Sequence, residues 1–160
     1  MVNRLKAYWL KNVSIDATKI QSRFGTAEAA TRKMVTVAFL ATLSAIFQSM
    51  GGFLPGIGFL ISPLATAPTV LSAVISVGSG LTAYVLTIIL LFFIQPSELI
   101  IFPFTTGLLG LGIGWSLVYL RTRLSAVFAG SFCLWAGIVL LLYVFRFPVL
   151  GPAASSSFNW

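Results

Sequence analysis

An uncharged apolar run over residues 34–50, MVTVAFLATLSAIFQSM, constrains this chain most. It follows directly on a basic pair at 32–33. A helix over the run would be about 25 Å long, close to the ~30 Å hydrocarbon thickness of a bilayer. The next segment, GGFLPGIG at 51–58, is rich in glycine and contains a proline, so a turn is expected there. The sequence therefore predicts a membrane-spanning helix followed by a turn.

The composition extends this prediction to the whole chain. The 160 residues are 58% hydrophobic and only 8% charged, whereas soluble domains carry about 25% charged residues. Backbone polar groups in a bilayer must pair within the protein, and helices satisfy them within one segment. We expect an all-α integral membrane protein, multi-pass, in the cell membrane.

The basic residues are unevenly placed along the chain. Two lie in a short loop, Arg121 and Arg123, and seven of the ten precede Met34. These seven are Arg4, Lys6, Lys11, Lys19, Arg23, Arg32 and Lys33. The positive-inside rule places both regions in the cytoplasm, the N-terminus included. Because no RNA- or DNA-binding motif accompanies the charges, no nucleic-acid partner is expected.

The residue inventory excludes most site chemistry. The chain contains no histidine, a single cysteine (Cys133) and three acids, Asp16, Glu28 and Glu98. A zinc site, a Ser/His/Asp triad and a disulfide within the chain are therefore excluded. We expect no catalytic residue, no metal and no cofactor, so the protein is not expected to be an enzyme.

Three parts are expected along the chain. Residues 1–33 form a basic, amphipathic segment with an interfacial helix on the cytoplasmic surface, with the lipid bilayer as its partner. Residues 34–146 form the transmembrane bundle, and 147–160 a short polar tail. The helices are expected at about 34–50, 59–77, 81–94, 98–119 and 124–145, with Gly78-Ser79-Gly80 as a cytoplasmic turn and 51–58 and 95–98 as outer turns.

Two details of the bundle follow from proline and glycine. Pro63 and Pro68 interrupt the second helix, and Thr66 is a candidate N-cap for a segment starting near Pro68. Gly110 and Gly114 form a GxxxG pair in the fourth helix, which predicts a close approach of another helix.

The order of these features resembles a known family over roughly residues 34–123. Three sequences carry the likeness: Ala41-Thr42-Leu43-Ser44-Ala45, Pro68-Thr69-Val70-Leu71 followed by Gly78-Ser79-Gly80, and the glycine-rich fourth helix before a short basic loop. They resemble the substrate-binding S components of energy-coupling-factor vitamin transporters and related small bacterial membrane proteins. The resemblance implies a bundle of six helices with a transmembrane coupling subunit and ATPase subunits as partners. The apolar runs themselves predict five spans, so a bundle of five or six helices is expected.

The candidate substrate residues lie near the two outer turns. Glu98 is the only acid within the hydrophobic region, and Gln48 lies at similar depth near the end of the first helix. Together with Gln95 and Ser97 they could bind a small molecule from outside, or Glu98 could simply occupy a hydrated helix N-terminus. A lid over this site is expected from Gly52, Pro55 and Gly56.

A face of small residues, Ala38, Ala41 and Ala45, allows two interpretations. It could pack the first helix within the monomer, or it could meet the coupling subunit, a role that the resemblance implies for Ala41 and Ala45. Two functions stay open in the same way. The first is a substrate-capture subunit of an uptake transporter for a small molecule such as a vitamin. The second is a non-catalytic accessory or scaffold subunit of a larger membrane complex, with other subunits of that complex as partners.

Overall fold

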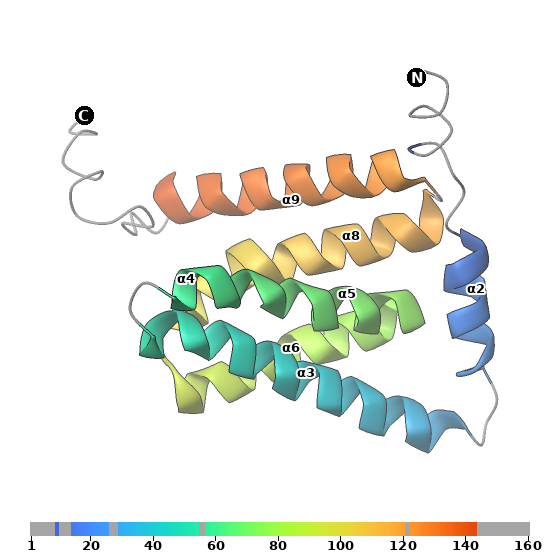
Figure 1. Cartoon of the computed structure of the whole chain (residues 1–160), viewed down its shortest axis with the longest axis horizontal. Coiled ribbons are helices and arrows are strands. Elements are labelled where there is room, and N and C mark those ends of the chain that lie inside the picture. The colour runs from blue at the N-terminus through green and yellow to red at the C-terminus, as the bar shows by residue number, and fades with distance from the viewer. Residues whose placement is uncertain (1–8, 10–13, 26–28, 55–56, 121, 144–160) are drawn as a thin grey trace.

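A computed structural model of the chain describes residues 9, 14–25, 29–54, 57–120 and 122–143. Over these ranges the chain is helical, without a β-strand (Figure 1). In chain order the elements are α2 (Ser14–Ser22), α3 (Ala29–Phe53), α4 (Gly58–Ile61), η1 (Ser62–Ala65), α5 (Thr66–Ile75), α6 (Val77–Ile94), α7 (Glu98–Phe102), η2 (Pro103–Gly107), α8 (Leu108–Tyr119) and α9 (Arg123–Tyr143).

Four helices in the described part of the chain are long and apolar enough to cross a membrane. They are α3, α6, the continuous segment Glu98–Tyr119 and α9. The apolar helix Ser62–Ile75 is shorter. The prediction of an all-α protein with helices that could span a membrane is confirmed for the described residues, while the count of five or six spans and the side of the N-terminus stay predictions.

The long helices run side by side, and α5 lies between α3 and α8 (Figure 1). α6 packs against α3 and α5, and α9 forms one edge of the bundle against α8 and η2. α2 lies across one end, where it contacts α5 and α8. Gln21 Nε2 on α2 donates to the carbonyl of Val74 at 3.1 Å, and Ala17 is buried. α2 thus closes one end of the bundle.

The expected turn at 51–58 begins later than the glycines suggest. Gly51 and Gly52 continue α3, which ends at Phe53, and Leu54 N still donates to Met50 O at 3.0 Å. Instead of breaking the helix, Gly51 leaves room for another segment, because a Cβ added at Gly58 would lie 2.9 Å from Gly51 Cα. Here the glycines permit close packing.

The prediction of a turn at 78–80 was wrong. α6 begins at Val77, and the chain breaks only at Ser76, whose backbone is extended (φ −166°, ψ 155°). The Ser76 hydroxyl accepts from Ser79 N at 3.0 Å and caps the helix. Gly80 is needed for packing, since a Cβ there would lie 2.7 Å from Ala73 Cβ.

This cap gives a first testable prediction. Ser76→Ala should lower the free energy of unfolding by about 1 kcal/mol, because it removes the side-chain acceptor of the first turn of α6. Denaturation in detergent, followed by circular dichroism, would measure the change. Ser97→Ala is a matched control, since Ser97 is exposed and caps no helix through its side chain. Equal stability of the two variants would refute the capping role.

The cap predicted at Thr66 was wrong for a different reason. The chain stays helical from Gly58 to Ile75 and tightens to a 3₁₀ turn at Ser62–Ala65, the segment that contains Pro63. Thr66 therefore lies within a continuous helix, and its buried hydroxyl has no hydrogen-bond partner among the described residues. The interruption expected at Pro63 is present as a tightened turn, whereas the one expected at Pro68 was wrong, because Pro68 lies within α5.

The prediction from the GxxxG pair is confirmed. Gly110 and Gly114 both face α5: a Cβ at Gly110 would lie 2.7 Å from Thr69 Cβ, and one at Gly114 would lie 3.1 Å from Val70 O. Backbone therefore approaches backbone along α5 and α8.

Candidate functional site

Three polar side chains from separate elements meet inside the bundle. Gln48 Nε2 on α3 donates to Glu98 Oε2 on α7 at 2.7 Å. Thr106 Oγ1 on η2 donates to Gln48 Oε1 at 2.6 Å. Gln48 is 2% exposed and Glu98 8% exposed. The structure therefore joins the two residues that the sequence placed at similar depth, and it adds Thr106.

The helix interruption explains how Thr106 reaches Gln48. Eight positions separate Glu98 from Thr106, which in a regular helix would turn their side chains about 80° apart. The π turn at Pro103–Gly107 absorbs an extra residue and moves Thr106 back towards the face of Glu98. The carbonyl of Pro103 accepts from the Tyr84 hydroxyl at 3.1 Å. The irregular turn is thus held from α6.

The other two predicted substrate residues lie at the rim. Gln95 Nε2 donates to Ser97 Oγ at 3.0 Å, in an exposed position. Gln95 also lies over Gly52, where a Cβ would be 3.4 Å from Gln95 Cγ. The four candidates therefore form two pairs, one buried and one exposed, and substrate binding by either stays a prediction.

Of the predicted lid, the structure describes only Gly52. Gly52 belongs to the last turn of α3, which ends at Phe53, and not to a loop. Pro55 and Gly56 lie outside the described residues, so opening or closing of this segment stays a prediction.

The three small residues predicted to share one face of α3 differ in burial. Ala41 and Ala45 are fully buried by the chain's own helices, whereas Ala38 is exposed. The carbonyl of Ala41 accepts from the Thr87 hydroxyl of α6 at 3.2 Å. In this structure Ala41 and Ala45 pack the bundle, and contact of this face with a coupling subunit stays a prediction.

A substitution tests this packing. Ala41→Leu should lower the free energy of unfolding by roughly 1–3 kcal/mol, because no room remains for three added carbons between α3 and α6. Ala38→Leu on the same helix should change it by less than about 0.5 kcal/mol. Unfolding in detergent would compare the two. If Ala41→Leu also left stability unchanged, this face would be more loosely packed than the structure shows.

The sequence analysis missed a second group of buried polar residues that share hydrogen bonds. The Ala65 carbonyl accepts from Ser44 Oγ at 2.9 Å and from Thr69 Oγ1 at 3.0 Å. Ser44 precedes Gln48 by one helical turn, so the i, i+4 spacing was the signal that both polar groups share a buried face. The hydrogen bonds of Ser44 and those of Gln48 together make α3 polar on the side that faces η1 and η2.

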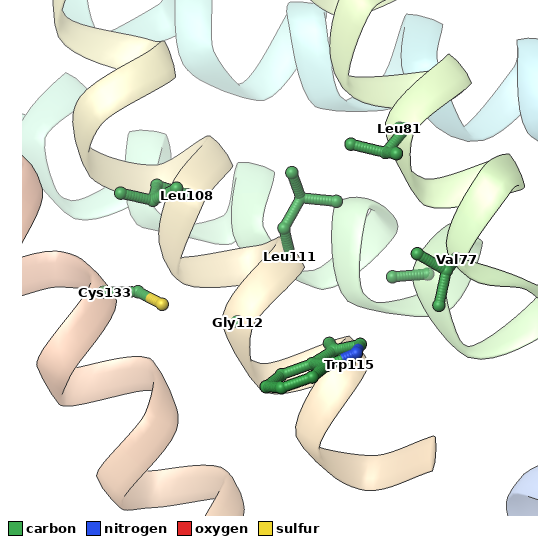
Figure 2. Close-up of a pocket in the computed structure, with 8 residues that line it drawn as sticks. Val77, Leu81, Leu108, Leu111, Gly112, Trp115 and Cys133 are labelled. Atoms are coloured by element: carbon green, nitrogen blue, oxygen red, sulfur yellow. The ribbon is translucent and has the colours of Figure 1, made fainter. Parts of the chain in front are cut away.

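A separate cleft of about 260 Å³ opens between α5, α6, α8 and α9 (Figure 2). Its lining is apolar: Ala73, Val77, Leu81, Leu108, Leu111, Gly112, Trp115 and Cys133. It lies away from the Gln48–Glu98 pair, and the only side-chain polar groups in its lining are the Trp115 indole N–H and the Cys133 thiol. The cleft therefore does not correspond to the small-molecule site expected beneath residues 51–58.

Long apolar helices around an interior polar cluster define a helical membrane protein, and the fold supports that class and nothing narrower. No protein-family model, curated protein or solved structure matches the chain. The resemblance to transporter S components therefore stays a prediction from the sequence.

Proposed function

We propose that this protein is the substrate-capture subunit of an energy-coupling-factor-type uptake transporter for a small molecule such as a vitamin. The observation that carries the proposal is the buried pair Gln48–Glu98 beside two helices that change to a 3₁₀ turn at Ser62–Ala65 and to a π turn at Pro103–Gly107. Ionisable groups within membrane helices usually mark functional sites. π turns within α-helices occur frequently at functional sites.

In this proposal the ligand competes for groups that now bind one another. Glu98, Gln48 and Thr106 would supply the polar contacts, and Gln95 and Ser97 would meet the ligand at the rim. The sequence contains no phosphate-binding loop. ATP hydrolysis would therefore come from separate ATPase subunits, acting through a transmembrane coupling subunit.

The proposal predicts the effect of a conservative change. Glu98→Gln should weaken ligand binding by roughly 10- to 100-fold, since a hydrogen bond to a charged group contributes about 1.5–3 kcal/mol. The ligand would be the compound released from protein purified without additions, identified by mass spectrometry and returned in an equilibrium binding assay. Ser97→Ala, which alters only the exposed rim, should weaken binding less. Absence of any released compound, or unchanged affinity in Glu98→Gln, would contradict capture.

One observation favours the alternative of an accessory or scaffold subunit. Of the four long helices, α9 has the smallest share of residues buried inside the protein. The share is 22% over its apolar window of 18 residues, against 39% for α3. Its exposed side chains include Val127, Phe128, Phe132 and Trp135. Such a face could meet lipid or another subunit. Co-purification separates the functions: a coupling protein with two ATPases supports capture, and a different membrane complex supports the scaffold.

A further inference from the structure

The apolar cleft runs along one face of α8. Its floor is formed at the spacing i, i+3, i+4 and i+7 by Leu108, Leu111, Gly112 and Trp115, between walls from α6 and α9 (Figure 2). A helix rises about 10 Å from Leu108 to Trp115, and about 16 Å to the end of α8 at Tyr119. One leaflet of a bilayer has about 15 Å of hydrocarbon, half of the full thickness. The cleft and the helix end beyond it together have the depth of one leaflet.

The cleft is too narrow for another helix. A volume of about 260 Å³ along about 10 Å of α8 gives a width of about 6 Å, whereas a helix with its side chains is about 10–12 Å across. An acyl chain is thinner than a helix and carries no polar group along its length, which suits a lining of alkyl side chains. In a protein whose described part has four helices able to span a membrane, lipid chains are the apolar segments that such a cleft would meet.

One end of the cleft carries a polar group suited to the headgroup level. Trp115 is half exposed, and its ring centroid lies 5.6 Å from that of Tyr119. The Trp115 indole N–H is directed towards Val77 across the cleft and has no hydrogen-bond partner among the described residues (Figure 2). Trp and Tyr are enriched where hydrocarbon meets headgroups, because their rings are apolar and carry one polar tip. We therefore expect the Trp115 end at the membrane surface.

α2 brings positive charge to the same end. It contacts α5 and α8, which both line the cleft, and its Gln21 binds the Val74 carbonyl of α5 at 3.1 Å. Lys19 on α2 and Arg23 just after it are exposed, two positions before and after Gln21. Asp16 is the acid of this helix, so the two cations outnumber it. This charge is complementary to an anionic headgroup.

We propose that the cleft binds one acyl chain of an anionic phospholipid, with the glycerol ester at Trp115 and the phosphate beside Lys19 and Arg23. The indole N–H would donate to an ester carbonyl. A lipid chain gains little by leaving other chains for an apolar protein surface. Selectivity therefore comes from the headgroup, at roughly fivefold for each basic residue near the surface. The inference depends on a membrane location and not on the proposed capture of a small molecule.

Fluorescence quenching by brominated lipids tests the proposal on the full-length chain. Trp9, Trp135 and Trp160 are replaced by phenylalanine, which leaves Trp115 as the single tryptophan. The bilayer is phosphatidylcholine, and a small share of its lipid is brominated on the acyl chains, as either phosphatidylglycerol or phosphatidylcholine. Brominated phosphatidylglycerol should quench Trp115 as strongly as a roughly 10- to 30-fold larger share of brominated phosphatidylcholine.

Two results would overturn the proposal directly. Equal quenching by the two brominated lipids would make the cleft an ordinary lipid-facing surface. No quenching by either lipid would mean that another part of a protein covers Trp115.

A matched pair of variants on α6 locates the bound chain. Val77→Phe adds bulk inside the cleft and should remove the preference for phosphatidylglycerol. Val85→Phe makes the same change at an exposed position of α6 outside the cleft and should keep the preference. Circular dichroism checks that both variants stay helical. A preference that survives Val77→Phe, or is lost equally in both variants, would overturn the assignment to the cleft.

A second pair of variants locates the headgroup. Lys19→Gln combined with Arg23→Gln should bring quenching by the two lipids within about twofold of each other. Arg32→Gln combined with Lys33→Gln removes the same charge from α3, a helix that does not line the cleft, and should keep most of the preference. Equal losses in the two double variants would show a general attraction of anionic lipid to the basic end and would overturn a specific headgroup site at α2.

Discussion

Replacing Gly110 and Gly114 together by leucine is expected to lower the free energy of unfolding by roughly 3 kcal/mol or more, since overpacking costs about 1–3 kcal/mol at each site. Both glycines face α5 at contact distance, with Thr69 against the first and the Val70 carbonyl against the second. A leucine at either position must push α5 and α8 apart. Because α5 also packs on α3 and α6, that displacement would disturb the centre of the bundle.

Unfolding by a denaturing detergent, followed by circular dichroism, would measure this loss. Gly78→Leu is the matched control: Gly78 is exposed in the first turn of α6, and a Cβ there would come no closer than 4.0 Å to any side chain. The control should be as stable as the unchanged protein within about 0.5 kcal/mol. A double variant as stable as this control would mean that α5 and α8 are not in close contact.

The apolar runs predicted most helices well because burial in lipid leaves the backbone few alternatives. The segment expected at 98–119 has those bounds in the structure, even though Pro103 lies within it. The helix expected at 124–145 is observed as Arg123–Tyr143. Charge did not set every end: the helix expected at 34–50 is observed as Ala29–Phe53 and includes Arg32 and Lys33.

Glycine was the main source of error. Gly51 and Gly52, and the triplet at 78–80, were interpreted as turns, yet they lie in α3 and α6. A glycine can end a helix or allow a neighbour to approach it, and the local sequence is the same in both cases. Only the segment that packs against the glycine distinguishes the two roles: Gly58 packs against Gly51, and Ala73 packs against Gly80.

The polar site was predictable in part. Gln48 and Glu98 were expected at one depth because each lies near the predicted outer end of its helix, and they form a hydrogen bond. Thr106 could not be placed in this way, since the regular helical period assigns it to another face. The π turn that redirects it has no signature in the sequence beyond Pro103. Irregular turns are therefore the part of this site that required the structure.

Gln48→Leu should be among the most destabilising single changes in the bundle, lowering the free energy of unfolding by about 3 kcal/mol. Leucine is similar in size, so packing changes little. The loss comes from the partners: Glu98 Oε2 and the Thr106 hydroxyl both bind Gln48, and neither has another hydrogen bond in the described structure that would replace it. Unfolding in detergent at neutral pH would measure it.

A double variant tests whether the lost stability comes from the unpaired Glu98 carboxylate or from altered packing. If the unpaired carboxylate is responsible, adding Glu98→Leu to Gln48→Leu should cost less than the sum of the single changes, with a coupling of about 1–3 kcal/mol. Gln95→Leu, whose amide binds only the exposed Ser97, is the control and should change stability by less than about 0.5 kcal/mol. Simple additivity of the two losses would show that Gln48 and Glu98 stabilise the bundle independently, and the buried pair would lose its place as the interaction that joins α3 to α7.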